Sequence, residues 1–130
     1  MGTRCLTVFK NDKNKEICVM YRQFDGYPNG HGVELANFLS KGIICNGLTG
    51  QPGKYFNGME DLTAQVISHL KNEPGGFYIH PAGTRDIWEE YIYTVTGELG
   101  KEPIIECHTA SGELIAKGSA TIMIKKMSKE

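Results

Sequence analysis

The residue types best suited to bind a ligand lie in one short stretch, RQFDGYPNGHGVELANFL, at residues 22–39. Phe24 and Tyr27 offer flat faces on which a purine can stack, a contact worth about 1–3 kcal/mol per base in comparable sites. Asp25 lies between them in the sequence, and its carboxylate can accept hydrogen bonds from ribose hydroxyls or a base amino group. These residues together predict a site for a nucleotide.

The same stretch is rich in glycine, which has two explanations. Gly30 and Gly32 would let a phosphate approach the free amides at the start of the following helix. Alternatively, Asp25-Gly26 is a turn dipeptide that a plain strand-to-helix connection would use. A turn by itself has no need for the nearby aromatic rings or for His31, so we expect His31 to belong to the site. The glycine spacing matches neither a Walker nor a dinucleotide-binding fingerprint.

A second cluster lies in FYIHPAGTRDIW, residues 77–88. It combines a titratable donor, a cation and a large aromatic ring in His80, Arg85 and Trp88. Arginine is suited to bidentate phosphate contact and tryptophan to stacking. In the simpler interpretation, Arg85 pairs with Asp86 or a surface acid, and Trp88 belongs to the core.

No motif of a known catalytic or metal centre appears. The patterns HExxH, GxSxG and HxE with PCxxC are absent from the sequence, and the four cysteines form no CxxC pair. We therefore expect no catalytic residue, no metal and no cofactor, and cysteines that act as small apolar residues. A general acid–base pair of Asp25 and His31 stays open, although their spacing is not specific to any reaction.

Composition predicts one soluble domain over residues 1–130, with ordinary values of 40% hydrophobic and 22% charged residues. The formal net charge of −1 lacks the basic excess of proteins that grip nucleic-acid backbone, so no nucleic-acid partner is expected. No apolar run is long enough to span a bilayer, and the start MGTRCLTVF lacks the apolar region of a signal peptide. We expect no membrane partner and a cytoplasmic location, in the host cell if the gene is viral.

The elements that would position these residues begin with a hairpin. Leu6 and Val8 alternate with other residues, as do Val19 and Tyr21, on either side of a polar turn at residues 11–15. Two helices are then expected from apolar residues at helical spacing, over residues 33–41 and 59–71. Four glycines and a proline within residues 43–58 predict a loop there, and closure of this loop over a site stays open.

Four further strands are expected in GFYIHP, IWEEYIYTVTG, PIIECHTA and ELIAKGSATIMIKK. The last of these, residues 113–126, shows almost strict alternation of small and apolar residues on one face. The order ββ-αα-ββββ predicts an α+β fold, with an antiparallel sheet of about six strands and both helices packed on one face.

Four segments carry a resemblance to a known family. They are MGTR at the start, YRQFDGYPNGHG at residues 21–32, the ELANFL that follows, and GGFYIHP. Together they resemble the phage and prophage Thoeris anti-defence sponges, which bind cyclic ADP-ribose-type immune signals and withhold them from host effectors. The likeness covers the N-terminal third well and the middle loosely.

The resemblance implies an α+β protein that assembles as a dimer or higher homo-oligomer and holds a small-molecule cyclic nucleotide without cleaving it. In such sponges the sites lie at subunit boundaries and use aromatic stacking with arginine contacts to phosphates. Carried over by region, it assigns ligand binding to residues of the corner, of the second cluster and of the MGTR start: Phe24, Asp25, Tyr27, His31, His80, Arg85, Trp88 and Arg4.

The chain departs from that family in two places. Members place an arginine near the start of the second helix, where this chain has Glu60 and Asp61. The region EPIIECHTASGELIAKGSATIMIKK also does not match clearly. The ligand therefore stays open between a cyclic ADP-ribose-type signal and a cyclic di- or trinucleotide. Two other functions also stay open: an enzyme that degrades such a nucleotide with His31 or His80 as acid or base, and a module that binds a host protein through the edge of the last strand.

Overall fold

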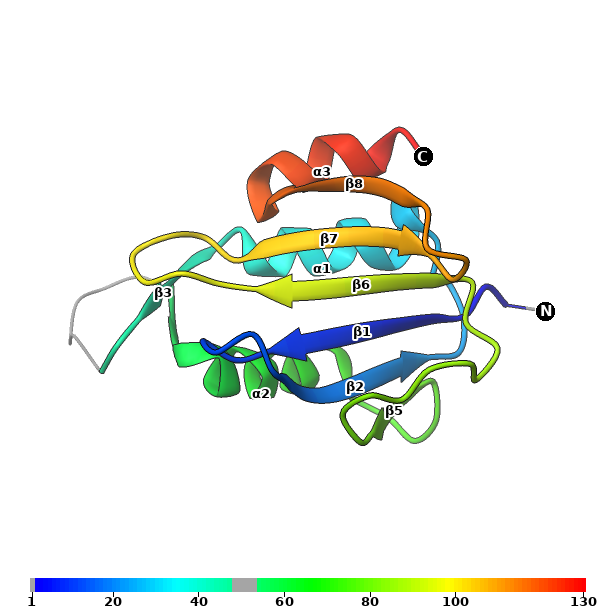
Figure 1. The fold of residues 1–130 in the computed structure, drawn as a ribbon, viewed down its shortest axis with the longest axis horizontal. Helices are drawn as coiled ribbons and strands as arrows, with labels where there is room; N and C mark the ends of the chain where they lie inside the picture. Colours follow the sequence, from blue (N-terminus) through cyan, green and yellow to red (C-terminus); the bar gives the residue numbers. More distant parts are fainter. Residues whose placement is uncertain (1, 48–53) are drawn as a thin grey trace.

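The computed structural model describes residues 2–47 and 54–130, and within them the chain forms a six-stranded sheet with helices on one side (Figure 1). The spatial order of the sheet is β5 (Phe77–His80), β2 (Glu16–Arg22), β1 (Cys5–Lys10), β6 (Tyr91–Thr96), β7 (Ile104–Thr109) and β8 (Leu114–Ser119). The helices are α1 (Val33–Leu39), which follows a short π-helical turn η1 (Pro28–Gly32), then α2 (Gly58–Leu70) and α3 (Ala120–Ser128). The predicted α+β class is confirmed.

The predicted hairpin is present as β1 and β2. Val8 pairs with Val19 and Leu6 with Tyr21, so the alternating apolar residues share a face. The side-chain carbonyl of Asn11 closes the turn by accepting hydrogen bonds from the backbone N–H groups of Lys13 at 2.9 Å and Lys15 at 3.0 Å.

The sheet is mixed, which corrects the antiparallel prediction. β1 and β6 run parallel at its centre, with Cys5 opposite Tyr91 and Phe9 opposite Val95. The cause is the position of β5, which pairs with β2 at one edge. The β5–β6 connection then crosses the sheet to the far side of β1, and β6 pairs there in parallel, an arrangement that requires a crossover connection.

A third helix replaces the end of the predicted last strand, residues 113–126. β8 stops at Ser119, and α3 follows directly. Ala120, Met123 and Met127 are fully buried at helical spacing, whereas Ile122 is half exposed. Glu102 stabilises the start of α3, since its carboxylate accepts a hydrogen bond from the N–H of Thr121 at 2.9 Å. This helical burial outweighs the alternating pattern of the sequence.

The two predicted helices are confirmed with small shifts at their ends. The predicted loop over residues 43–58 is only partly a loop, because it contains the short parallel pair β3 (Gly42–Cys45) and β4 (Lys54–Asn57). Its middle, residues 48–53, lies outside the described residues, so whether it closes over a site stays a prediction.

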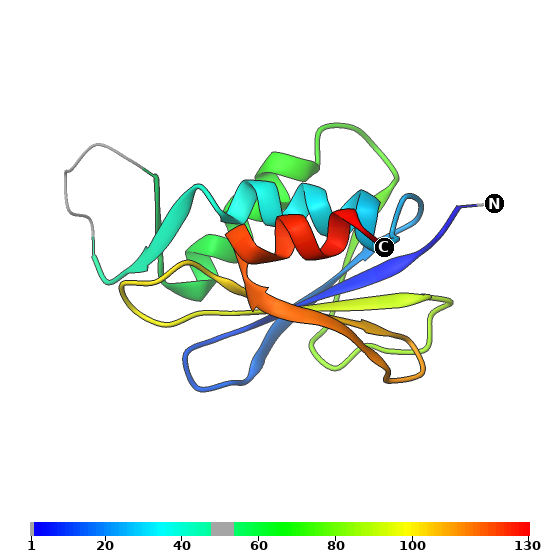
Figure 2. The same cartoon turned by 90° about the horizontal axis from the view of Figure 1, so that it is seen from above.

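Figure 2 shows the three helices gathered on one side of the sheet. The main core lies between the two layers, around Phe9, Leu35, Leu62 and Tyr93. The other side of the sheet, referred to below as the open face, carries a smaller cluster of Leu6, Val8 and Val19. The β5–β6 connection covers this cluster with Ile87. In the part of the chain that is described, no helix has the length and apolar character needed to cross a membrane.

Candidate functional site

The stretch between β2 and α1, residues 23–32, forms a tight corner that backbone hydrogen bonds hold in place. Asp25 adopts a left-handed backbone with φ of 60°, and its carbonyl accepts a hydrogen bond from the N–H of His31 at 2.8 Å. A side chain at Gly30 would bring its Cβ within 2.7 Å of that same carbonyl oxygen and within 2.9 Å of the Tyr27 ring. The glycine is therefore required by close packing of the corner itself.

A cavity of about 410 Å³ opens at this corner. Its lining includes Arg22, Asp25, Tyr27, Gly30, Glu34 and Asn37. Tyr27 is 41% exposed, and the ring of neighbouring Phe24, outside the cavity, is 44% exposed. The corner thus presents aromatic faces and carboxylates beside one cation.

That cation, Arg22, is the last residue of β2 and is only 8% exposed. Its Nη1 forms an ion pair with the carboxylate of Glu34 on α1 and lies 3.2 Å from Nδ1 of His31. The guanidinium lies 4.8 Å from the centroid of the Phe77 ring and 5.8 Å from that of Phe24. Two aromatic rings and two hydrogen-bonding partners thus fix its position.

His31 is fully buried, so it does not reach the cavity surface. Its Nε2 lies 2.7 Å from Oγ1 of Thr7, and its ring meets Tyr93 edge to face. Burial, and then the positive charge of Arg22, lower the pKa of His31 from 6.5 to about 3. Because arginine can only donate, the neutral ring accepts from Arg22 at Nδ1 and donates to Thr7 at Nε2. His31 therefore positions Arg22, and these side-chain bonds do not pair it with Asp25.

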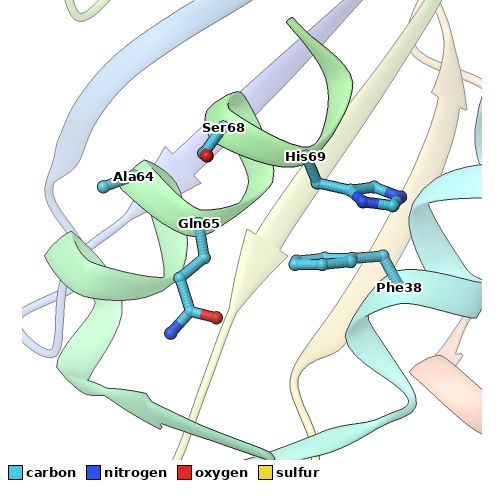
Figure 3. A pocket seen from close by; sticks show the side chains of 5 residues that line it. All are labelled: Phe38, Ala64, Gln65, Ser68 and His69. Atoms are coloured by element: carbon cyan, nitrogen blue, oxygen red, sulfur yellow. The ribbon is translucent and has the colours of Figure 1, made fainter. Parts of the chain in front are cut away.

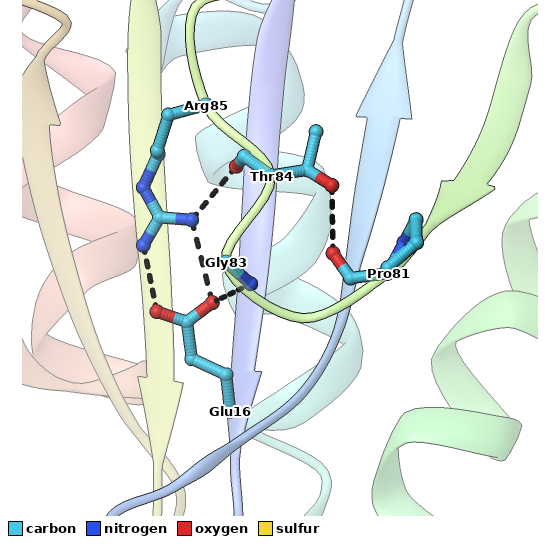
Figure 4. Close-up of polar contacts among 5 residues, drawn as sticks. All are labelled: Glu16, Pro81, Gly83, Thr84 and Arg85. Carbon is cyan, nitrogen blue, oxygen red and sulfur yellow. Dashed lines mark hydrogen bonds and ion pairs between the residues drawn. The ribbon is translucent and has the colours of Figure 1, made fainter.

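Arg85 of the second predicted cluster lies in the β5–β6 connection on the open face (Figure 4). Arg85 forms a two-point ion pair with Glu16 of β2, with Nη2 at 2.9 Å from Oε2 and Nη1 at 3.3 Å from Oε1. The N–H of Gly83 also donates to Glu16 at 2.7 Å. Burial tends to raise the pKa of Glu16, but the hydrogen bonds from Arg85 and Gly83 and nearby positive charge outweigh it, so the pKa is lowered. Arg85 thus anchors the loop, as the simpler interpretation expected of a surface ion pair.

Trp88 is the most exposed large apolar side chain in the described structure, at 82%. Its backbone has a φ of 78°, and Asp86 has a φ of 60°, both in the left-handed region. The carboxylate of Glu89 holds this turn by accepting hydrogen bonds from the N–H groups of Asp86 at 2.9 Å and Ile87 at 2.8 Å. The indole borders a hollow of about 280 Å³ and is not part of the core.

Backbone hydrogen bonds of the N-terminal segment, which contains Arg4, connect the corner to the second loop. The carbonyl of Thr3 accepts from Gly26 of the corner at 2.9 Å, and that of Arg4 accepts from Glu90 at 2.8 Å. The corner and the second loop therefore both border the N-terminal segment at one end of the sheet. His80, on β5, meets the Tyr21 ring edge to face on the open face. The corner cavity and the hollow beside Trp88 share no lining residue. A smaller cavity of about 90 Å³ is lined by both Phe24 of the corner and Phe77.

Two other hollows lie away from these clusters. One, of about 410 Å³, lies between α1 and α2, where the rings of Phe38 and His69 stack with centroids 4.4 Å apart (Figure 3). The other, of about 680 Å³, is a polar groove on the open face. There Glu106 lies between His108 at 3.1 Å and Lys117 at 3.4 Å. The contact of Glu106 with Lys117 is a surface ion pair, which contributes little to stability.

Sequence reasoning missed Arg22 and Glu34. The sequence did contain a signal for Arg22. Cys18, Met20 and Arg22 occupy every second position of β2, so Arg22 lies on the same buried face of the sheet as Met20. A buried cation needs an anionic partner. Glu34, the acidic residue in the first turn of α1, is that partner.

Within residues 2–47 and 54–130, no group of three or more histidine, cysteine or acidic side chains is arranged to hold a metal ion. Comparison with known proteins adds no assignment: no protein-family model, no curated protein and no solved structure matches the chain.

Proposed function

We propose that this protein binds a cyclic nucleotide immune signal, of the cyclic ADP-ribose type or a cyclic oligonucleotide, and sequesters it without cleavage as a viral anti-defence protein. The observation that carries the proposal is the corner cavity, in which the exposed ring of Tyr27, the carboxylate of Asp25 and the buried guanidinium of Arg22 border one space of about 410 Å³. This volume lies within the range of small-molecule sites.

Each of the three groups suits a different part of a nucleotide. The Tyr27 ring can stack on a base. Asp25 can accept hydrogen bonds from ribose hydroxyls or an exocyclic amino group, and Arg22 supplies the positive charge that an anionic ligand requires. The family resemblance of residues 21–32 supports the same class of ligand.

Sequestration fits the corner better than catalysis does. The side chains that line the cavity include no serine, cysteine or histidine, so its acid–base candidates are carboxylates and Tyr27. His31, the partner that an acid–base pair with Asp25 would need, is buried and neutral at physiological pH. An acid–base role needs a group that reaches the ligand and exchanges a proton near the working pH. Tight binding needs only convergent donors and aromatic walls.

A homo-oligomer is part of the proposal. Phe24, Tyr27 and Trp88 expose large aromatic surfaces on segments at the same end of the sheet. Aromatic residues of this kind are enriched at protein interfaces. A second copy packed against this end would cover them and would add a wall to a cavity that is open in one chain.

The test is a thermal-shift screen against cyclic ADP-ribose isomers and cyclic di- and trinucleotides, followed by mass spectrometry of the ligand released by heat. We expect a large upward shift for one compound, which returns intact, because a ligand that binds only the folded state stabilises it. An altered product at molar excess would replace the proposal with an enzyme. No shift across the panel would overturn it and direct attention to protein partners.

Variants then locate the site. Tyr27→Leu should abolish the shift, whereas Tyr78→Leu, which removes a similarly exposed tyrosine from β5, should keep it. Arg85→Ala tests the second loop separately. If it binds as the parent does, Arg85 serves only the Glu16 anchor. If Tyr27→Leu binds as well as the parent, the corner is not the site.

A further inference from the structure

The hydrogen bonds of the buried Arg22 side chain are unevenly distributed. A guanidinium carries five N–H donors. The two described hydrogen-bond partners of the Arg22 side chain are His31 and Glu34, and both contact Nη1. Nε is buried and has no hydrogen-bond partner among the described residues, and none of the hydrogen bonds described there involves Nη2. Buried polar groups without partners are rare because each costs free energy.

The two unused nitrogens form one chemical unit. Nε–H and the neighbouring N–H of Nη2 point in the same direction, and this edge of the guanidinium can bind two oxygens of one oxyanion at once. The aromatic rings of Phe77 and Phe24 lie over the guanidinium, while His31 and Glu34 hold Nη1. This leaves the Nε–Nη2 edge as the part of Arg22 that can still bind. Arg22 lines the corner cavity, so an oxyanion bound there can reach the guanidinium.

We propose that the Nε–Nη2 edge of Arg22 is the anion-binding element of the corner cavity and takes one singly charged oxyanion of the phosphodiester type. This inference rests on the proposed function and names the ligand group that the corner holds. The ligand group is limited to a single negative charge because two carboxylates, Asp25 and Glu34, line the same cavity as Arg22. A second negative charge on the ligand would face two carboxylates with one cation between them.

His31 and Glu34 act as positioning residues in this arrangement. They fix Nη1 from the helix side, so the free edge keeps one orientation and loses little conformational freedom on binding. The carboxylates of Asp25 and Glu34 weaken the anion site by their negative charge. Their neutral variants should therefore bind the anion more tightly, which a site built from a generic surface cation elsewhere would not show.

The direct measurement is a titration of the Arg22 Nε–H signal in a two-dimensional ¹H–¹⁵N spectrum, with dimethyl phosphate as the probe. The signal is assigned by its absence from Arg22→Lys. We expect a saturable downfield shift of this proton as it gains an acceptor, with sodium chloride at equal ionic strength causing none. Dimethyl phosphate is singly charged throughout the usual pH range and carries neither base nor sugar, so it isolates the proposed contact.

The affinity of variants for dimethyl phosphate tests the same contact. Asp25→Asn and Glu34→Gln should each tighten dimethyl phosphate binding by about three- to tenfold, since each removes a like charge. Arg22→Lys keeps the charge but loses the two-point edge, and it should weaken binding at least about tenfold. Lys41→Gln, which removes a cation just after α1, is the control and should leave affinity unchanged.

Several results would overturn the inference: an Nε–H signal that does not move, an equal shift with chloride, or neutral variants that bind no tighter. These outcomes are separable from the fate of the proposed function. If a cyclic nucleotide binds while dimethyl phosphate leaves Arg22 untouched, sequestration stands and the Arg22 contact fails. If the probe binds but no nucleotide does, the anion site stands and the sponge function fails.

Discussion

Mild acid should destabilise this protein through the buried histidine His31. The folded state lowers the pKa of His31 to about 3 from an ordinary value of 6.5, by burial and by the charge of Arg22. Below pH 6.5 the unfolded chain takes up a proton at this position, while the folded chain does not until about pH 3. The unfolded state therefore binds more protons across this window, and the free energy of unfolding falls as the pH falls.

The size of the stability loss follows from the pH range between the two pKa values of His31. Each pH unit below 6.5 costs about 1.4 kcal/mol for one such group, so the step from pH 7 to pH 5 should cost about 2 kcal/mol. That is a substantial part of the 5–15 kcal/mol typical of a domain's stability. Glu16 contributes little in this range, because its pKa is lowered from 4.5 and the stability it provides is lost only at lower pH.

The assay is urea unfolding at pH 7, 6 and 5 of the parent and of His31→Gln. The glutamine amide can accept from Arg22 and donate to Thr7 but does not titrate, so its stability should change about 2 kcal/mol less between pH 7 and 5. His69→Gln removes an exposed imidazole from α2 and should behave as the parent. Equal losses of stability in the parent and in His31→Gln would refute the reasoning.

Three further predictions test the fold and the second loop by denaturant unfolding. Met123→Ala should cost about 2–5 kcal/mol and Ile122→Ala under about 1, because α3 buries the first and half exposes the second; the reverse order would mean a strand. Gly26→Ala should cost about 2 kcal/mol or more, since its Cβ would lie 2.9 Å from backbone atoms of the N-terminal segment; a neutral result would show that the corner can relax. Trp88→Gly should be about 1 kcal/mol more stable than Trp88→Ala, because only glycine relieves the positive φ; equal stabilities would show that the turn adjusts.

The parts of the fold that could be predicted are those with one dominant pattern. The β1–β2 hairpin combines alternating apolar residues with turn chemistry at Asn11, and α2 has an uninterrupted apolar stripe. The region after Ser119 fits two patterns at once. Ala120, Ile122 and Ile124 alternate as in a strand, while Ala120, Met123 and Met127 have helical spacing, and only packing against α1 and the sheet favours the second.

The mixed sheet and the Arg22 network could not be predicted for a different reason. Which strand lies beside β1 depends on the path of the connection after β5, and no residue of β1 or β6 encodes that neighbour. Of the candidate site, Tyr27 and Asp25 do line the corner cavity. His31 turned inward because its ring fills the space between Thr7 and Tyr93, a contact between distant segments that residue type alone does not reveal.

The parallel pairing of β1 with β6 also has a kinetic consequence. The middle of the sheet joins a strand near the start of the chain to one in its last third, with Cys5 opposite Tyr91. Chains dominated by such distant pairings fold slowly, on a scale of about milliseconds to seconds. Until β6 arrives, the β1–β2 hairpin keeps one unpaired edge and the uncovered side chains of Leu6 and Val8. Exposed apolar surface and an unpaired strand edge make a folding intermediate prone to aggregation, so this interval is when the chain is most exposed to it.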